Sequence, residues 1–154
     1  MKFLKLYLKL CDKIPQDAVS HLGFRVGNGV IFHLIKRPGG IHVASARCEE
    51  CLFYKLMTRS YVLNTPTIVD GKLRVIVADN HAVRKLLTQH ASQVARLEPL
   101  RSIHVTFTKK QREVLAALAN GHNITSAARE YAVSKVAVYK IFKNALRKLV
   151  ILIS

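Results

Sequence analysis

The sequence predicts an α+β protein in which an N-terminal mixed α+β domain, residues 1–100, precedes an all-helical C-terminal domain, residues 101–154. Half of the 154 residues are apolar, which is enough for a folded core. Short apolar runs broken by glycine and proline fill the first domain, a pattern typical of strands joined by turns. Beyond residues 98–102 the composition changes from β-branched to alanine-rich, which favours helices and marks a domain boundary.

The opening segment, 3–11, is compatible with two kinds of secondary structure. Its apolar residues alternate as in a half-buried strand, but Lys2, Lys5 and Lys9 would also share one face of a helix. We favour the strand.

A hairpin is expected next. Gly27-Asn28-Gly29 and Pro38-Gly39-Gly40 supply the backbone angles that chain reversals need. The two apolar runs that follow these turns, 30–35 and 41–46, are therefore predicted to pair.

A further turn at Asp70-Gly71 leads into 72–77, a strand that we expect to be buried on both faces. Asp79 or Asn80 then caps a helix that runs to about Gln89. A short strand over 94–97 is expected to stop before Pro99, because proline has no amide hydrogen to donate.

Three helices are predicted in the C-terminal domain. The first begins at Thr108, which with Gln111 three positions later forms a candidate capping box, and it ends at Asn120-Gly121. Asn123 or Thr125 caps a short second helix that continues to Tyr131. The third is capped by Ser134 and extends through Leu149.

This spacing is typical of a helix-turn-helix unit. Such a unit needs small and apolar side chains facing inward around a tight corner, and those at the required offsets are Ala127, Ala128, Tyr131, Val133, Val138 and Ile141. The residues left pointing outward, and so predicted to bind DNA, are Ser134, Lys135, Val136, Tyr139, Lys140 and Lys143. Lysine can donate to guanine or phosphate, valine can contact a thymine methyl group, and tyrosine can make either kind of contact. Lys109 and Lys110 are predicted to contact phosphates.

The residues from Phe107 to Gly121, 127–134, Val138-Tyr139 and 145–149 resemble the helix-turn-helix of LuxR-type regulators and of sigma-factor region 4. In these families the corner position is usually glycine, whereas this chain has Ala132. The whole layout, with Arg96 to Arg101 leading into Thr108 to Arg112, is similar to archaeal regulators of the bacterio-opsin activator type. This resemblance implies a transcription factor whose N-terminal domain senses a signal or dimerises.

The charge of the chain agrees with this function. Twenty-five lysines and arginines against nine acidic residues give a net charge of +16, which favours a polyanionic partner. Residues 1–100 and 101–154 each carry +8, so the shorter segment is the more densely positive. We therefore expect a transcription regulator that binds specific double-stranded DNA sequences and is not an enzyme.

Its expected partners are double-stranded DNA, a second copy of the chain, and RNA polymerase or general transcription factors. The apolar segment 149–153 is a candidate dimer seam or a lid on the N-terminal domain, and ordinary helix packing within one chain is an equal alternative. No uncharged apolar stretch is long enough for a signal peptide or a membrane span, so no membrane partner is expected. A cytoplasmic, nucleoid-associated location follows.

Two alternative functions remain open from the residues. Cys48 and Cys51 have the spacing of a metal-binding or redox pair, and a zinc site would need further ligands such as Cys11, His42 or His21. The simpler interpretation, with two small apolar side chains and no metal or cofactor, is favoured. A recombinase-like DNA-processing enzyme or accessory subunit would need a nucleophile among arginines, and Ser60-Tyr61 beside Arg59 is the one suggestive place.

Overall fold

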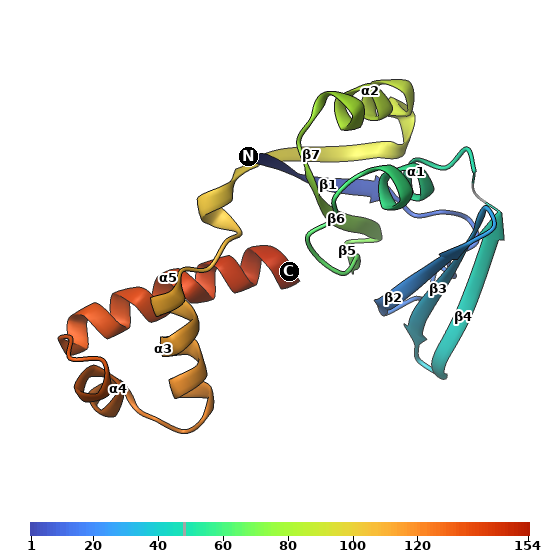
Figure 1. The fold of residues 1–154 in the computed structure, drawn as a ribbon. Helices are drawn as coiled ribbons and strands as arrows, with labels where there is room; N and C mark the ends of the chain where they lie inside the picture. The colour runs from blue at the N-terminus through green and yellow to red at the C-terminus, as the bar shows by residue number, and fades with distance from the viewer. Residues whose placement is uncertain (48) are drawn as a thin grey trace. The chain divides into compact units, whose positions relative to one another are not determined.

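The computed structural model describes residues 1–47 and 49–154 (Figure 1). The chain divides into two compact units, the N-terminal unit Met1–Arg101 and the C-terminal unit Ser102–Leu152. The predicted fold class is confirmed, because antiparallel sheets build the first unit and helices build the second. None of the described helices is both long and apolar enough to cross a membrane.

The N-terminal unit contains, in chain order, β1 (Lys2–Lys9), β2 (Ser20–Gly27), β3 (Val30–Arg37), β4 (Gly40–Arg47), α1 (Leu52–Arg59), β5 (Thr67–Val69), β6 (Lys72–Ala78), α2 (His81–Gln89), the 3-10 turn η1 (Ala91–Gln93) and β7 (Val94–Arg101). The C-terminal unit contains the 3-10 turn η2 (Ser102–His104), α3 (Lys109–Ala119), α4 (Ile124–Glu130) and α5 (Lys135–Ile153).

The first sheet has the strand order β5-β6-β1-β7, with every pair antiparallel. The opening segment is therefore a strand, as favoured, and it lies in the interior of the sheet. Leu4, Leu6 and Leu8 are buried in a core that also contains side chains of β6, α1 and α2. Residues 73–78 of β6 are all buried, which confirms that this strand is covered on both faces.

The second sheet has the order β2-β3-β4. The predicted hairpin is confirmed and is longer than expected, because β3 and β4 stay paired from Val30 opposite Arg47 to Arg37 opposite Gly40. Asn28 and Gly29 join β2 to β3 with positive φ angles of 50° and 74°, as the turn prediction requires. On β3, Ile31, His33 and Ile35 point into the interior and are buried.

One expectation for the N-terminal unit needs correction. The strand predicted over 94–97 does not stop before Pro99 but runs to Arg101, so most of the expected boundary segment is strand. Because β7 is an edge strand that, among the described strands, pairs with β1 alone, proline can be tolerated where an amide hydrogen would point away from the sheet. Of the two caps expected for α2, Asn80 is the one present, and its side chain accepts a hydrogen bond from the Val83 amide at 2.9 Å.

Candidate nucleic-acid interface

Local hydrogen bonds fix both ends of α3. Thr108 Oγ1 accepts from the Gln111 amide at 3.2 Å and Gln111 Oε1 accepts from the Thr108 amide at 3.1 Å, so the predicted capping box is present. At the other end Gly121 has a φ of 92°, and the His122 amide donates to the Ala117 carbonyl at 3.0 Å. This is a Schellman ending, in which a left-handed residue lets the chain leave the helix.

The corner between α4 and α5 repeats this geometry without glycine. Asn123 caps α4 by accepting from the Ser126 amide at 2.8 Å. The Val133 amide donates to the Ala128 carbonyl at 3.0 Å, and between them Ala132 has a φ of 51°. Alanine therefore adopts the left-handed angle that glycine adopts most easily, and the corner keeps its tight form.

The three helices share a small core of buried residues, namely Val114, Ala127, Ala128 and Val138. The two alanines let the neighbouring helices approach closely. Tyr131, at the end of α4, packs against this core and donates from its hydroxyl to the Glu113 carbonyl of α3 at 3.2 Å. The inward-facing residues of the predicted helix-turn-helix thus lie where the pattern placed them.

The outward face of α5 also agrees with the expectation. Ser134 begins the helix by accepting from the Ala137 amide at 3.1 Å. All six predicted contact residues from Ser134 to Lys143 are exposed, and the two that are partly or wholly apolar, Val136 and Tyr139, expose 63% and 51% of their surface. Lys143 Nζ lies 6.0 Å from the centre of the Tyr139 ring. The face therefore combines hydrogen-bond donors with an aromatic and an aliphatic surface.

Arg147 extends this face and was not among the predicted contact residues. Tyr139, Lys143 and Arg147 follow one another at intervals of four, so they lie along one side of the helix. Arg147 is exposed and donates to Asn144 Oδ1 at 3.4 Å, one turn earlier. The spacing of four could have revealed it in the sequence.

Lys109 and Lys110 lie apart from the start of α5. They directly precede Gln111, whose side chain accepts a hydrogen bond from Lys148 near the far end of α5. Lys148 lies 13 positions after Lys135, the first residue of α5. At 1.5 Å per residue, Lys109 and Lys110 are on the order of 20 Å along α5 from Lys135. Both are exposed, and Lys109 Nζ lies 3.7 Å from Glu113 Oε1. They form a second basic position and do not belong to the face of α5.

The electrostatics of the C-terminal unit favour an anionic partner. Its nine lysines and arginines stand against two acidic residues, and both acids have partners: Glu113 near Lys109, and Glu130 at 3.4 Å from His122. The first turn of α5 has no acidic residue but contains Lys135, although the helix dipole disfavours a cation there. An anion at this position would stabilise both the lysine and the unpaired amides of the helix end.

Comparisons with known proteins add no evidence on the function of this chain. No family model, curated protein or solved structure matches the chain. The assignment of a function therefore depends on the geometry and charge of the helices described above.

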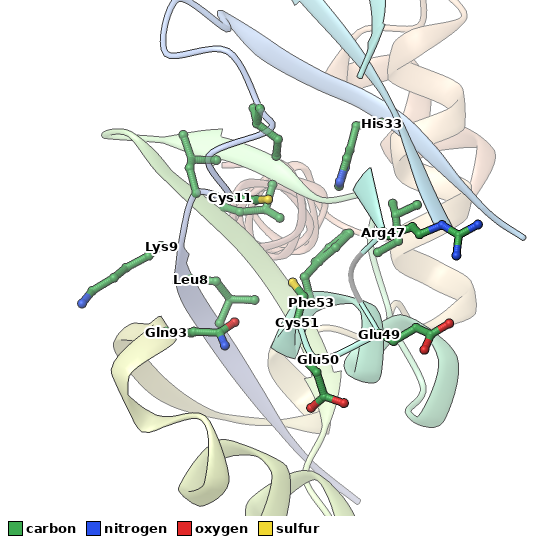
Figure 2. Close-up of a pocket in the computed structure, with 14 residues that line it drawn as sticks. Leu8, Lys9, Cys11, His33, Arg47, Glu49, Glu50, Cys51, Phe53 and Gln93 are labelled. Carbon is green, nitrogen blue, oxygen red and sulfur yellow. The ribbon is translucent and has the colours of Figure 1, made fainter. Parts of the chain in front are cut away.

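The N-terminal unit contains a separate candidate site, a cavity of about 610 Å³ between its two sheets and α1. Its floor is apolar, with Leu8, Ile31 and Phe53, while Cys11, Cys51 and His33 add polar atoms. The charged residues of the lining are Lys9, Arg47, Glu49 and Glu50. Figure 2 shows the two cysteine sulfurs and the His33 ring directed toward the centre, whereas Lys9 and Arg47 extend away from it.

The predicted metal candidates are only partly assembled. Cys11 and Cys51 line the same cavity, whereas His42 is exposed on β4 and does not line it. Cys48 lies outside the described residues. Among residues 1–47 and 49–154, no group of three or more histidine, cysteine or acidic side chains is arranged to hold a metal ion.

His33 is a lining residue that sequence reasoning missed. Its Nδ1 lies 2.9 Å from His21 Nε2, and both rings are buried, close to Phe53. Burial lowers the pKa of both histidines, and the neighbouring His33 lowers that of His21 further, to about 4. The pair is therefore uncharged at neutral pH. Alternation along 30–35 could have predicted an inward-facing residue, but not its partner 12 positions earlier.

The candidate nucleophiles of the recombinase alternative, Ser60 and Tyr61, lie directly after the last residue of α1. The Ser60 hydroxyl donates to the Leu56 carbonyl. The neighbouring Tyr61 side chain is 75% exposed. A backbone carbonyl is thus the acceptor of the Ser60 hydroxyl, whereas activation of a nucleophile needs a base within hydrogen-bond distance.

Proposed function

We propose that this chain is a transcription regulator that binds specific sequences of double-stranded DNA with the C-terminal unit. The observation that carries the proposal is the exposed face of α5, where Lys135, Val136 and Tyr139 stand in the first two turns after a tight helix-turn-helix corner. Side chains at the start of a recognition helix are those that reach base edges in the major groove.

Basic residues around this face support the same function. Lys140, Lys143 and Arg147 extend along α5, and Lys109 and Lys110 add charge at the start of α3. In this arrangement the basic residues of α5 lie beside the major groove, and the two lysines of α3 contact the phosphates. Phosphate contacts fix the position of the protein on the duplex and carry no sequence information of their own.

Selection of bound duplexes from a random pool, followed by affinity measurements across a salt series, tests the proposal. We expect an enriched sequence that binds at least about a thousandfold more tightly than random DNA, with affinity falling as salt rises. If two copies bind together, the half-sites should be related by a two-fold axis and lie about 34 Å apart, or a multiple of that distance. Salt-sensitive binding without an enriched sequence would contradict specific regulation, and no binding would contradict the proposal entirely.

We further propose that the cavity of the N-terminal unit binds a small, uncharged and mostly apolar effector. Its volume of about 610 Å³ lies in the range of small-molecule sites, and its apolar floor with a few polar groups has their usual composition. The pair His21 and His33, uncharged at neutral pH, adds a hydrogen-bonding group without a charge.

Screening small aromatic fragments by NMR tests this role. Bound fragments should shift the methyl signals of Leu8 and Ile31 and leave those of Val114, in the C-terminal unit, unchanged. Fragments that shift no signal of the lining residues would contradict an effector site here.

A further inference from the structure

The described strand edges of the N-terminal unit differ in how they are protected from pairing with other strands. Exposed edges invite association, and proteins usually protect them with charge, proline, bulges or short length. The edge strand β5 has three residues, β7 contains Arg96, Glu98 and Pro99, and β2 has a register shift between His21 and Gly23. These three edges therefore have recognisable protection.

The edge of β4 has none of these features. It is eight residues long and, among the described strands, it pairs with β3 alone. From Gly40 to Ala46 it contains no lysine, arginine, acidic residue or proline. Ile41 and Val43 are 62% and 66% exposed. A long, uncharged and apolar edge of this kind is a template for another strand.

The sheet face beside this edge is mostly apolar, and its charged lining residue, Arg25 of β2, lies with its guanidinium 4.4 Å from the centre of the Phe32 ring. Val43 lies opposite Leu34 on β3, and both line a hollow of about 370 Å³ together with Phe32. Gly23 on β2 borders the hollow, and no atom lies within 4 Å of where its side chain would be. A strand added at β4 would cover part of this surface.

We propose that β4 pairs in antiparallel fashion with β4 of a second copy of this chain, joining two three-stranded sheets into one. A two-fold axis through Val43 would place Val43 opposite itself and Ile41 opposite Ser45 of the second copy. Such an interface is isologous, because each copy contributes the same surface. The proposal concerns the N-terminal unit and does not depend on DNA binding.

The distribution of charge is the reason to choose a second copy of this chain as the partner that pairs with β4. Two chains of net charge +16 repel each other over most of their surfaces, so two copies approach with least repulsion along an edge that carries no lysine or arginine between Gly40 and Ala46. In the proposed register Arg47, the one charged residue of β4, lies opposite Gly39 of the second copy, so like charges do not face each other. An uncharged seam within a basic protein fits another copy of the same protein.

Light scattering during size-exclusion chromatography of the full chain tests the pairing. We expect a dimer whose population rises with salt, because salt screens the repulsion between the copies. Val43→Lys and Val43→Glu should each raise the dimer dissociation constant at least tenfold, since identical charges would then face each other. An equimolar mixture of the two variants should restore the dimer, which a folding defect could not do.

Val19→Lys is the matched control, because Val19 is a 58% exposed valine of the same unit that precedes β2. It should leave the dimer intact, and circular dichroism should show native secondary structure for all the variants. A dimer that survives Val43→Lys would overturn the proposal and place the seam elsewhere, for example at the apolar end of α5. A wild-type chain that stays monomeric at high salt and high protein concentration would overturn it as well.

Discussion

Lys148 of α5 donates a hydrogen bond from its buried Nζ to Gln111 Oε1, 2.8 Å away at the start of α3. The same nitrogen donates to the Thr106 carbonyl at 2.7 Å and lies 5.9 Å from the centre of the Phe107 ring. Because Gln111 Oε1 also accepts from the Thr108 amide, one oxygen atom links the cap of α3 to the third helix. α5 thus has one lysine facing the protein and several facing solvent.

Lys148→Ala should lower the free energy of unfolding of the C-terminal unit by about 2 kcal/mol, because it removes hydrogen bonds made by a buried charged group. Lys143→Ala, which changes an exposed lysine of the same helix, should alter stability by less than about 0.5 kcal/mol. Urea unfolding followed by circular dichroism measures both values. Equal stabilities for the two variants would show that the Lys148 contacts contribute nothing.

Ala132→Gly should stabilise the corner between α4 and α5 by roughly 0.5–1 kcal/mol. Ala132 is exposed and has a φ of 51°, so glycine would relieve backbone strain without loss of packing. The reverse change, Gly121→Ala at a φ of 92°, should cost about 1 kcal/mol although no atom lies within 4 Å of the new methyl group. Thermal unfolding of both variants measures the two changes in stability. Changes of the same sign would contradict the argument that backbone strain is their cause.

Lys135→Ala or Tyr139→Ala should weaken binding to the selected duplex by about 1–3 kcal/mol and binding to random DNA much less. Lys109→Ala, at the separate basic position, should weaken both alike and reduce the slope of affinity against salt by about one. Fluorescence anisotropy with the two duplexes separates these effects. Equal losses of binding affinity on both duplexes for all three variants would contradict the assignment of α5 as the recognition helix.

Acidification should destabilise the N-terminal unit through His21. Its pKa is about 4 when folded and near 6.5 when unfolded, so the unfolded chain takes up a proton first as the pH falls. The stability contributed by the neutral ring is complete above pH 6.5 and is lost progressively as the pH falls to about 4, by up to about 3 kcal/mol. His33, whose pKa is also lowered, acts in the same direction.

Urea titrations at several pH values, followed by the NMR signals of β2 and β3 amides, measure this loss. His21→Phe should flatten the dependence on pH, whereas His81→Asn, at an exposed histidine of α2, should leave it unchanged. A wild-type unit equally stable at pH 6.5 and pH 4 would contradict a buried neutral pair.

Elements set by local chemistry were predictable from the sequence. The capping box of Thr108, the helix end at Gly121 and the turn at Asp70-Gly71 depend on residues within a few positions of one another. The same is true of the outward face of α5, since helical spacing alone determines which side chains share a side.

Features that depend on distant partners were not predictable in the same way. The strand character of the opening segment is fixed by its pairing with β6 and β7, and the continuation of β7 past Pro99 by its place at the sheet edge. We did not predict α1, whose Leu52, Phe53 and Leu56 are buried against the first sheet. The contacts of His33 and Lys148 likewise join residues that are far apart in the chain.

The interior position of β1 also determines the order in which this protein can form during its synthesis. β1 is made before its two neighbours in the sheet, β6 and β7, which are complete only at Ala78 and Arg101. The leucines of β1 must therefore stay exposed on the ribosome until most of the N-terminal unit has emerged, which is when nascent chains are most prone to aggregate. The three helices that follow need only contacts within about fifty residues, so they can fold quickly once they have been made.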